Sequence, residues 1–417
     1  MTHSHHDHDA SHTTPAIRRR LGIAVVPFAV ATLVGLVLLW PPSDTSEPKV
    51  GQARQYRATV VESDQQDCGE LVQRGSFECF AITARLDEGP DEGTNITFQY
   101  TGGSGTRAIQ VGDGLWLVAG EGPEGQRSYF FADYQRTTPL LLLAILFAVV
   151  VVALSRWRGL AALAGLFLSL LVLVNFLLPA IFAGRSPLAV SIVGASLIMF
   201  FSLYLAHGVN ARTTTAVLGT LASLAITGIL ALIFVELTRF TGFATEEATF
   251  LQISAENVNL QGLLLGGIII GALGVLDDVT VTQASAVWEL HIANPTYGFV
   301  QLYSAAVRIG RDHIASTINT LVLAYVGASL PLLILFVATS RPLGSVLTSE
   351  VVAEEIVRTL VGSIGLVASV PITTALAAVS VTGDFPRFRK LGKEMDGSAD
   401  ESDEWKPPKQ EREWRDG

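Results

Sequence analysis

Residues 263–283 read LLLGGIIIGALGVLDDVTVTQ, and this stretch decides what kind of protein the chain is. Leucine, isoleucine, glycine and alanine in an unbroken run are typical of a membrane-spanning helix, whereas the carboxylates of Asp277 and Asp278 are costly at membrane depth. The apolar run 263–276 is shorter than the roughly 20 residues that a span needs, so the helix must start earlier or the bilayer must extend past both carboxylates. The stretch therefore predicts a membrane helix that carries acidic groups into a polar interior or to the membrane surface.

The rest of the chain is similarly apolar. Of its 417 residues, 49% are hydrophobic and 16% are charged, against about 25% charged in ordinary soluble domains. Apolar runs predict eight transmembrane helices, at residues 21–40, 138–154, 159–180, 187–206, 214–236, 261–282, 315–338 and 361–381. The expected fold is a predominantly α polytopic membrane protein in five parts: a His-rich tail 1–20, an anchor helix 21–40, a polar β domain 41–137, a seven-helix membrane domain 138–382 and a disordered tail 383–417.

Basic residues at the ends of the predicted helices indicate the orientation. One side carries Arg18, Arg19, Arg20, Arg156, Arg158, Arg212, Arg308, Arg311 and a cluster at 387–393, whereas the other carries Arg185, Arg239, Arg341 and Arg358. The positive-inside rule then places both termini in the cytoplasm and residues 41–137 outside. The run 21–40 ends at Trp40 without a small-residue cleavage site, which predicts a retained anchor rather than a signal peptide.

The polar domain 41–137 alternates short β-rich runs with glycine-rich turns. The runs are 56–61, 77–85, 95–100, 108–118 and 128–133, and five strands predict a small OB-like Greek-key barrel. Cys68 and Cys79 are the only cysteines of the chain, and an oxidising outer compartment favours a disulfide between them over two buried thiols. The domain has no catalytic or metal-binding motif, so we expect a structural cap or a module that docks a protein partner.

One face of the helix 261–282 has a distinct character. At helical spacing it reads Gly267, Gly271, Gly274, Asp278 and Thr282. The glycines predict close approach of another helix, and the polar half predicts that Asp278 handles a proton or cation in a cavity. Alternatively, both carboxylates lie at the cytoplasmic end of the helix, solvated or paired with an arginine. Adjacent positions point about 100° apart, so Asp277 is expected to serve a neighbouring helix.

A second polar stripe leads into the helix 315–338. Asp312, Ser316 and Asn319 follow one another at i, i+4 and i+7, and Arg308 and Arg311 precede or flank them. Topology alone explains the arginines but not Asn319, which falls inside the predicted bilayer. The two stripes together predict a transport site composed of Asp277, Asp278, Thr282, Arg308, Arg311, Asp312 and Asn319.

Other chemistries fit the sequence less well. The net charge of −10 excludes a basic nucleic-acid-binding surface. The sequence has no polyprenyl-transferase motif, no second, separated aspartate within another span of the kind an intramembrane aspartyl protease needs, and no zinc-protease pattern, so an enzyme is not predicted. The tract of His3, His5, His6, His8 and His12 could capture a divalent metal such as zinc, nickel or copper, or could be an incidental polar tail, and no other cofactor is expected.

Three blocks carry a resemblance to a known family. GALGVLDDVT at 271–280, IGRDHI at 309–314 and NTLVLAYVGASLP at 319–331 are similar to the YibE/F family of bacterial multi-pass membrane proteins. The resemblance extends over about 140–382 with the anchor and outer domain, and it implies topology more than chemistry. Family members often read Met-Asp where this chain has Asp277-Asp278, which implies that Asp278 is the shared carboxylate. The His-rich start resembles relatives from Gram-positive actinobacteria, which implies that the barrel lies outside the plasma membrane.

These features predict an integral protein of a bacterial plasma membrane. We expect an ion-coupled transporter or efflux permease for a small solute or ion, with its polar site between the sixth and seventh predicted helices. The alternative is a non-transporting assembly or sensor protein, whose outer β domain docks a protein partner and whose polar stripes only hold helices together.

Overall fold

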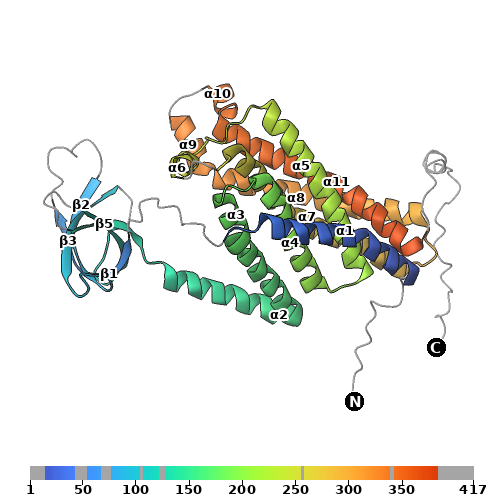
Figure 1. Ribbon diagram of the computed structural model, residues 1–417, viewed down its shortest axis with the longest axis horizontal. Coiled ribbons are helices and arrows are strands. Elements are labelled where there is room, and N and C mark those ends of the chain that lie inside the picture. The colour runs from blue at the N-terminus through green and yellow to red at the C-terminus, as the bar shows by residue number, and fades with distance from the viewer. Residues whose placement is uncertain are drawn as a thin grey trace, which may run out of the picture. The chain divides into compact units, whose positions relative to one another are not determined.

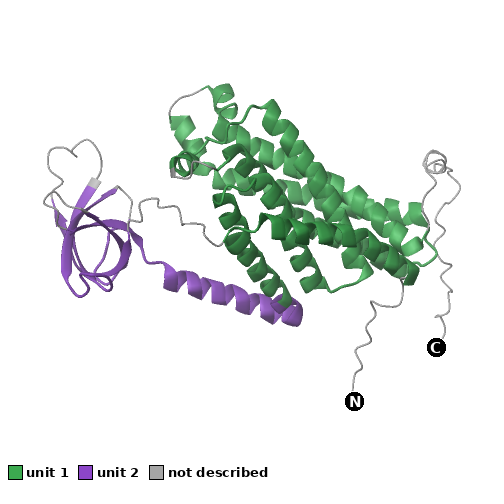
Figure 2. Cartoon of the chain, in the orientation of Figure 1, with its two compact units in different colours: residues 1–45, 161–417 green, residues 46–160 purple. Residues whose placement is uncertain are grey.

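The computed structural model describes residues 15–42, 54–66, 77–103, 107–121, 127–254, 258–338 and 342–383. The chain forms two compact units, one of residues 46–160 and one of residues 1–45 and 161–417 (Figure 1; Figure 2). The first unit holds a β domain and the start of a long helix, and the second holds the remaining helices.

The β domain is a five-stranded antiparallel sheet. Its strands are β1 (Gln55–Gln66), β2 (Phe77–Leu86), β3 (Asn95–Gly103), β4 (Gly114–Glu121) and β5 (Arg127–Tyr134). They pair in the order β3-β2-β1-β4-β5, and β3 also contacts β5, so the sheet is nearly closed into a barrel. The prediction of five strands and a barrel in this region is confirmed.

Alternate side chains of the strands fill the barrel. Ala58 and Val60 of β1 point inward with Ile82 of β2 and Leu115 of β4, and all four are fully buried. A tight turn before β4 completes the enclosure: Gly112, at a φ of 91°, donates its N–H to the Val60 carbonyl over 2.9 Å. Glycine is suited to this position because side chains are disfavoured at positive φ.

The helices of the chain follow its apolar runs. They are α1 (Pro15–Leu39), α2 (Thr137–Val172), the π-helical turn η2 (Leu173–Leu177), α3 (Leu178–Phe182), α4 (Pro187–His207), α5 (Ala211–Leu237), α6 (Glu246–Ser254), α7 (Leu260–Ala293), α8 (Phe299–Ala328), α9 (Leu330–Ala338), α10 (Leu343–Leu347) and α11 (Glu350–Thr382). Among the described residues, six helical stretches are long and apolar enough to cross a membrane, or seven if the bent pair α8 and α9 forms one span.

The difference from the predicted eight has two causes. The predicted spans 138–154 and 159–180 count together as the stretch Thr137–Phe182, although non-helical backbone at Arg156 separates two helices within it. The predicted span 315–338 bends by 58° between α8 and α9. Pro331 lies at this bend. Because proline has no backbone N–H to donate, it interrupts the regular hydrogen bonding of a helix.

Small residues bring α5 and α11 close together. A Cβ atom added at Gly219 of α5 would collide with the Thr373 side chain, and one added at Gly365 of α11 would collide with the Thr227 hydroxyl. These two contacts fix the helices in antiparallel register. Without a hydrophobic driving force between helices in lipid, such close packing is a main source of their association.

A small residue also allows close contact between α4 and α7. Gly266 of α7 lies so close to Ser191 that an added Cβ would meet its hydroxyl. Ser202 of α4 contacts Asp277 of α7, at the same sequence separation of 75 residues, so these two helices run parallel. The helix α7 therefore lies in the middle of a bundle with α4, α5, α8 and α11.

We predict that Gly365→Leu destabilises the bundle because the new side chain has no room beside Thr227. Overpacking of this kind costs roughly 1–3 kcal/mol, which thermal unfolding of the detergent-purified protein should record as a lower Tm. The matched control is Gly362→Leu, one turn away on α11, where an added Cβ meets nothing within 4 Å. Equal Tm values for the two variants would contradict the close contact.

The barrel should lose stability in acid. The Tyr129 hydroxyl donates to Asp91 over 2.5 Å and Arg127 donates over 3.0 Å, and these two bonds hold the pKa of Asp91 below its usual value of 3.8. Because the folded pKa lies below the unfolded one, the stabilisation is complete above the unfolded value and is lost as the pH falls through the folded value.

The measurement is the unfolding midpoint of the barrel between neutral pH and about pH 2. Asp91→Asn should have a lower midpoint than the wild type near neutral pH, and the difference should shrink in acid. A difference that does not change with pH would show that Asp91 is not charged in the folded barrel.

Candidate functional site

The two adjacent carboxylates of α7 lie in different surroundings. Asp277 is partly buried, and its Oδ2 accepts a hydrogen bond from the Ser202 hydroxyl of α4 over 2.8 Å. Its Oδ1 is buried and has no hydrogen-bond partner among the described residues. Asp278 is exposed on the surface of the chain. The sequence expectation that Asp277 serves a neighbouring helix matches this geometry.

Two threonines complete the surroundings of Asp277. Thr220 of α5 and Thr280 of α7 are fully buried, and their hydroxyls share a hydrogen bond of 2.7 Å. Thr280 also donates to the backbone carbonyl of Asp277 over 3.2 Å. We call Asp277, Ser202, Thr220 and Thr280 the Asp277 site. It brings α4, α5 and α7 together around one carboxylate.

Further buried hydroxyl groups extend from this site along α5 and α11. They belong to Thr215, Ser223 and Thr227 of α5 and to Ser363, Ser369, Thr373, Thr374 and Ser380 of α11. Most of them donate to a carbonyl of their own helix, as Ser223 does to Gly219 over 2.8 Å, and so cost little in an apolar interior. The hydroxyls of Ser363 and Thr373 are the exceptions, because both are buried without a partner in the described part of the chain.

Apolar clusters lie on both sides of the Asp277 site along the bundle. The Phe240 cluster comprises Ala231, Val235, Phe240, Leu264, Leu265, Ile268 and Val361. The Trp288 cluster comprises Ala211, Val287, Trp288, Leu302, Ala306, Ala377, Ala378 and Val381. In α7 the first cluster precedes Asp277 and the second follows it, so the carboxylate is separated from both ends of the bundle by apolar side chains.

Gln283 links three helices between Asp277 and the Trp288 cluster. Its amide nitrogen donates to the Ala306 carbonyl of α8 and to the Thr374 hydroxyl of α11, both over 2.7 Å. The side chain is almost fully buried, and Gly310 of α8 packs against it. The sequence interpretation did not single out Gln283, because a lone glutamine near a helix end gives no sign of its partners on α8 and α11.

The other residues of the predicted transport site lie on the surface. Asp278, Thr282, Arg308, Arg311, Asp312 and Asn319 are exposed, and the structure describes no hydrogen bond or ion pair that joins them to one another by their side chains. The Thr282 hydroxyl donates to the backbone carbonyl of Asp278 over 2.8 Å. The structure thus brings Asp277 into the bundle and leaves the rest of the set on an exposed face of α7 and α8.

The predicted glycine face is also exposed. An added Cβ would meet nothing within 4 Å at Gly267 or Gly274, and at Gly271 it would lie 3.6 Å from the Tyr325 hydroxyl. Close helix contact is made instead by Gly266, which precedes Gly267 and points about 100° away from it around the helix axis. Periodicity identified the small face correctly but not the face that another helix of this chain contacts.

Two further predictions concern residues at or beyond the limits of the described structure. His3, His5, His6, His8 and His12 lie outside the described residues, as does Cys68. Cys79 lies on β2 opposite Thr101 and is disulfide-bonded. Its pairing with Cys68 stays a prediction.

A second buried carboxylate lies near the start of α11. Glu354 is 9% exposed, and its Oε1 has no hydrogen-bond partner among the described residues. Its neighbour Glu350 accepts hydrogen bonds from the backbone of Thr241 and Gly242, which holds the loop after α5 to the start of α11. Arg358 pairs with Glu355 over 2.9 Å. Val361 of the Phe240 cluster follows Glu354 on α11 by about two helical turns.

The helices of the bundle match a known protein family. The model of the family described as YibE/F-like protein matches residues 143–383, more than half of the chain. The chain belongs to the YibE/F-like family. The match spans most of α2 through α11 and so includes the Asp277 site, whereas α1 and the barrel precede it. No curated protein and no solved structure matches the chain significantly.

We predict that Gln283→Met, which keeps the length of the side chain but removes both donors, destabilises the bundle. The Ala306 carbonyl and the Thr374 hydroxyl would each lose a buried partner, at a cost of about 1–3 kcal/mol in the free energy of unfolding. Thermal unfolding in detergent measures the change. A Tm equal to that of the wild type would mean that the two hydrogen bonds do not hold α7 to α8 and α11.

Proposed function

We propose that this YibE/F-like protein is an ion-coupled membrane transporter that moves a small solute or ion, and that the coupling proton or cation exchanges at Asp277. The observation that carries the proposal is the carboxylate with one unpartnered oxygen inside a bundle of apolar helices. Ionisable groups at membrane depth are costly, and where they persist they usually mark ion or proton pathways.

The surroundings of Asp277 support this role. A free carboxylate oxygen, the Ser202 hydroxyl and the paired hydroxyls of Thr220 and Thr280 can together hold a proton, a bound water or a hard cation. The Phe240 and Trp288 clusters close the bundle on either side. A transporter needs apolar barriers of this kind on both sides of its site, because the site must not be open to both sides of the membrane at once.

The proposal includes the orientation of the chain in the membrane, the type of barrel and the number of spans. The excess of basic residues on one side supports cytoplasmic termini and a barrel outside the plasma membrane of a bacterium. The five-stranded, nearly closed antiparallel sheet supports an OB-like barrel. An eight-span arrangement requires that Thr137–Phe182 crosses the bilayer twice, and the break at Arg156 supplies the point where it could turn.

A second candidate function has one observation in its favour. Asp278, Asp312 and Asn319 are exposed on α7 and α8, although polar groups cannot face lipid cheaply. A protein partner that covers this face would turn the chain into a membrane assembly or sensor protein, with the barrel as a further docking module. We favour transport because α4, α5 and α7 of the chain itself surround Asp277 and bury one of its oxygens.

The test is proton or cation flux in vesicles that contain the purified protein, with a pH-sensitive dye inside and a panel of solutes and cations outside. We expect Asp277→Asn to lower coupled flux by roughly tenfold or more, in line with the loss of a general proton-transfer group. The matched control is Asp278→Asn, which removes the adjacent, exposed carboxylate and should keep most of the flux. Flux that survives in Asp277→Asn but not in Asp278→Asn would move the site to the exposed face.

A further inference from the structure

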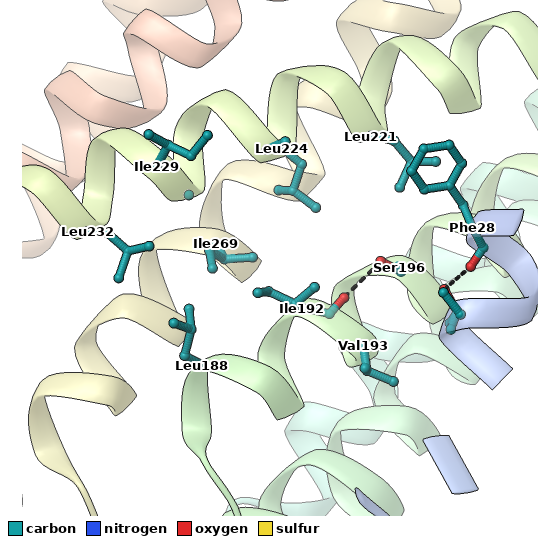
Figure 3. Close-up of a pocket in the computed structure, with 14 residues that line it drawn as sticks. Phe28, Leu188, Ile192, Val193, Ser196, Leu221, Leu224, Ile229, Leu232 and Ile269 are labelled. Carbon is teal, nitrogen blue, oxygen red and sulfur yellow. Dashed lines mark hydrogen bonds between the residues drawn. The ribbon is translucent and has the colours of Figure 1, made fainter. Parts of the chain in front are cut away.

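A crevice lies between α1, α4 and α5, apart from the Asp277 site (Figure 3). Its volume is about 400 Å³, within the roughly 300–1,000 Å³ of ligand pockets in proteins. Most of its walls are aliphatic or aromatic, including Phe28, Leu188, Ile192, Leu224 and Leu232, and Ile269 of α7 lies at its back. None of the residues of the Asp277 site lines it.

The crevice offers almost no hydrogen bonds to an occupant. Its only two hydroxyl groups belong to Thr32 and Ser196, and both are used within their own helices. Thr32 donates to the Phe28 carbonyl and Ser196 to the Ile192 carbonyl, each over 2.8 Å (Figure 3). A polar ligand would lose its hydration without replacement, so the chemistry selects a hydrocarbon chain.

The crevice opens through the apolar surface of the membrane helices. Ile192, Ile229 and Leu232 line it and remain 47%, 57% and 43% exposed. All three lie on α4 and α5, which are long and apolar enough to cross a membrane. An occupant can therefore enter sideways from the hydrocarbon core without crossing water.

Two arginines lie at the end of the crevice where α4 begins and α5 ends. Arg185 precedes Leu188 and Arg239 follows Leu232, each by roughly one to two helical turns. Both side chains are exposed, and the structure describes no ion pair for either. Basic residues at the ends of membrane helices are complementary to the anionic headgroup of a lipid.

We propose that the crevice binds an acyl chain of an anionic phospholipid, with the phosphate of the headgroup beside Arg185 and Arg239. The apolar walls recognise the chain and the two arginines recognise the charge. This site goes beyond the proposed transport function and does not depend on it.

The experiment uses the full-length protein in vesicles that contain phosphatidylglycerol or phosphatidylcholine with a photoactivatable acyl chain. After illumination, adducts are mapped by mass spectrometry. We expect adducts on the crevice residues of α4 and α5, several-fold more with phosphatidylglycerol than with phosphatidylcholine. Arg185→Gln combined with Arg239→Gln should abolish the preference between the two headgroups.

A filled crevice supplies the decisive comparison. An added Cβ at Gly228 meets only Ile269, at 3.9 Å, so Gly228→Phe can place its ring in the crevice. It should lower crevice adducts by roughly tenfold, which corresponds to about 1.4 kcal/mol of lost binding. Gly362→Phe, in open space on α11, is the matched control and should leave the adducts unchanged. Ala225→Phe, also in the crevice lining, serves as a second filling variant if Gly228→Phe fails to fold.

Two results would overturn the proposal. Equal adducts in Gly228→Phe, Ala225→Phe and the wild type would mean that the probe labels the general lipid surface. Equal labelling by the two headgroups in the wild type would mean that the crevice takes hydrocarbon chains without selecting an anionic lipid.

Discussion

The structure depends on the requirement that a carboxylate inside an apolar bundle be enclosed by protein. Asp277 meets it because α4, α5 and α7 approach one another closely enough for Ser202 to bond one of its oxygens and for Thr220 and Thr280 to pair beside it. Close approach in turn needs small residues where the helices cross. Glycine residues packed against serine or threonine occupy those positions between α4 and α7 and between α5 and α11. The same residues therefore allow the close packing of the helices and make the interior of the bundle polar.

This arrangement also explains how hydroxyl residues can be buried along the bundle. Hydroxyl side chains that donate to their own helix can be buried at little cost, and they line the contact between α5 and α11. Along α7 the Phe240 cluster precedes Asp277 and the Trp288 cluster follows it. Access to Asp277 from either side then requires one of the two clusters to open, and this is the kind of movement that the proposed transport cycle would use.

Much of the fold could be predicted from the sequence because it follows from local patterns. Apolar runs predicted the membrane helices, and alternation with glycine-rich turns predicted the five strands of the barrel. The site was harder, because it depends on contacts between residues far apart in the sequence. The small face with Gly267 and Asp278 was visible from periodicity, but the face that packs inside the chain carries Gly266 and Asp277, as only the positions of α4 and α5 reveal. The break at Arg156, by contrast, falls between the predicted spans 138–154 and 159–180, where Arg156 and Arg158 interrupt the apolar sequence.

The most direct test of the role of Asp277 is infrared difference spectroscopy of the purified protein in lipid, recorded as the pH or the cation concentration is changed. A carboxyl group that exchanges a proton or cation changes its C=O stretching band. The account predicts a band change that is present in the wild type and in Asp278→Asn and is absent in Asp277→Asn. The same band change in Asp277→Asn would contradict the claim that this carboxylate is where the ion exchanges.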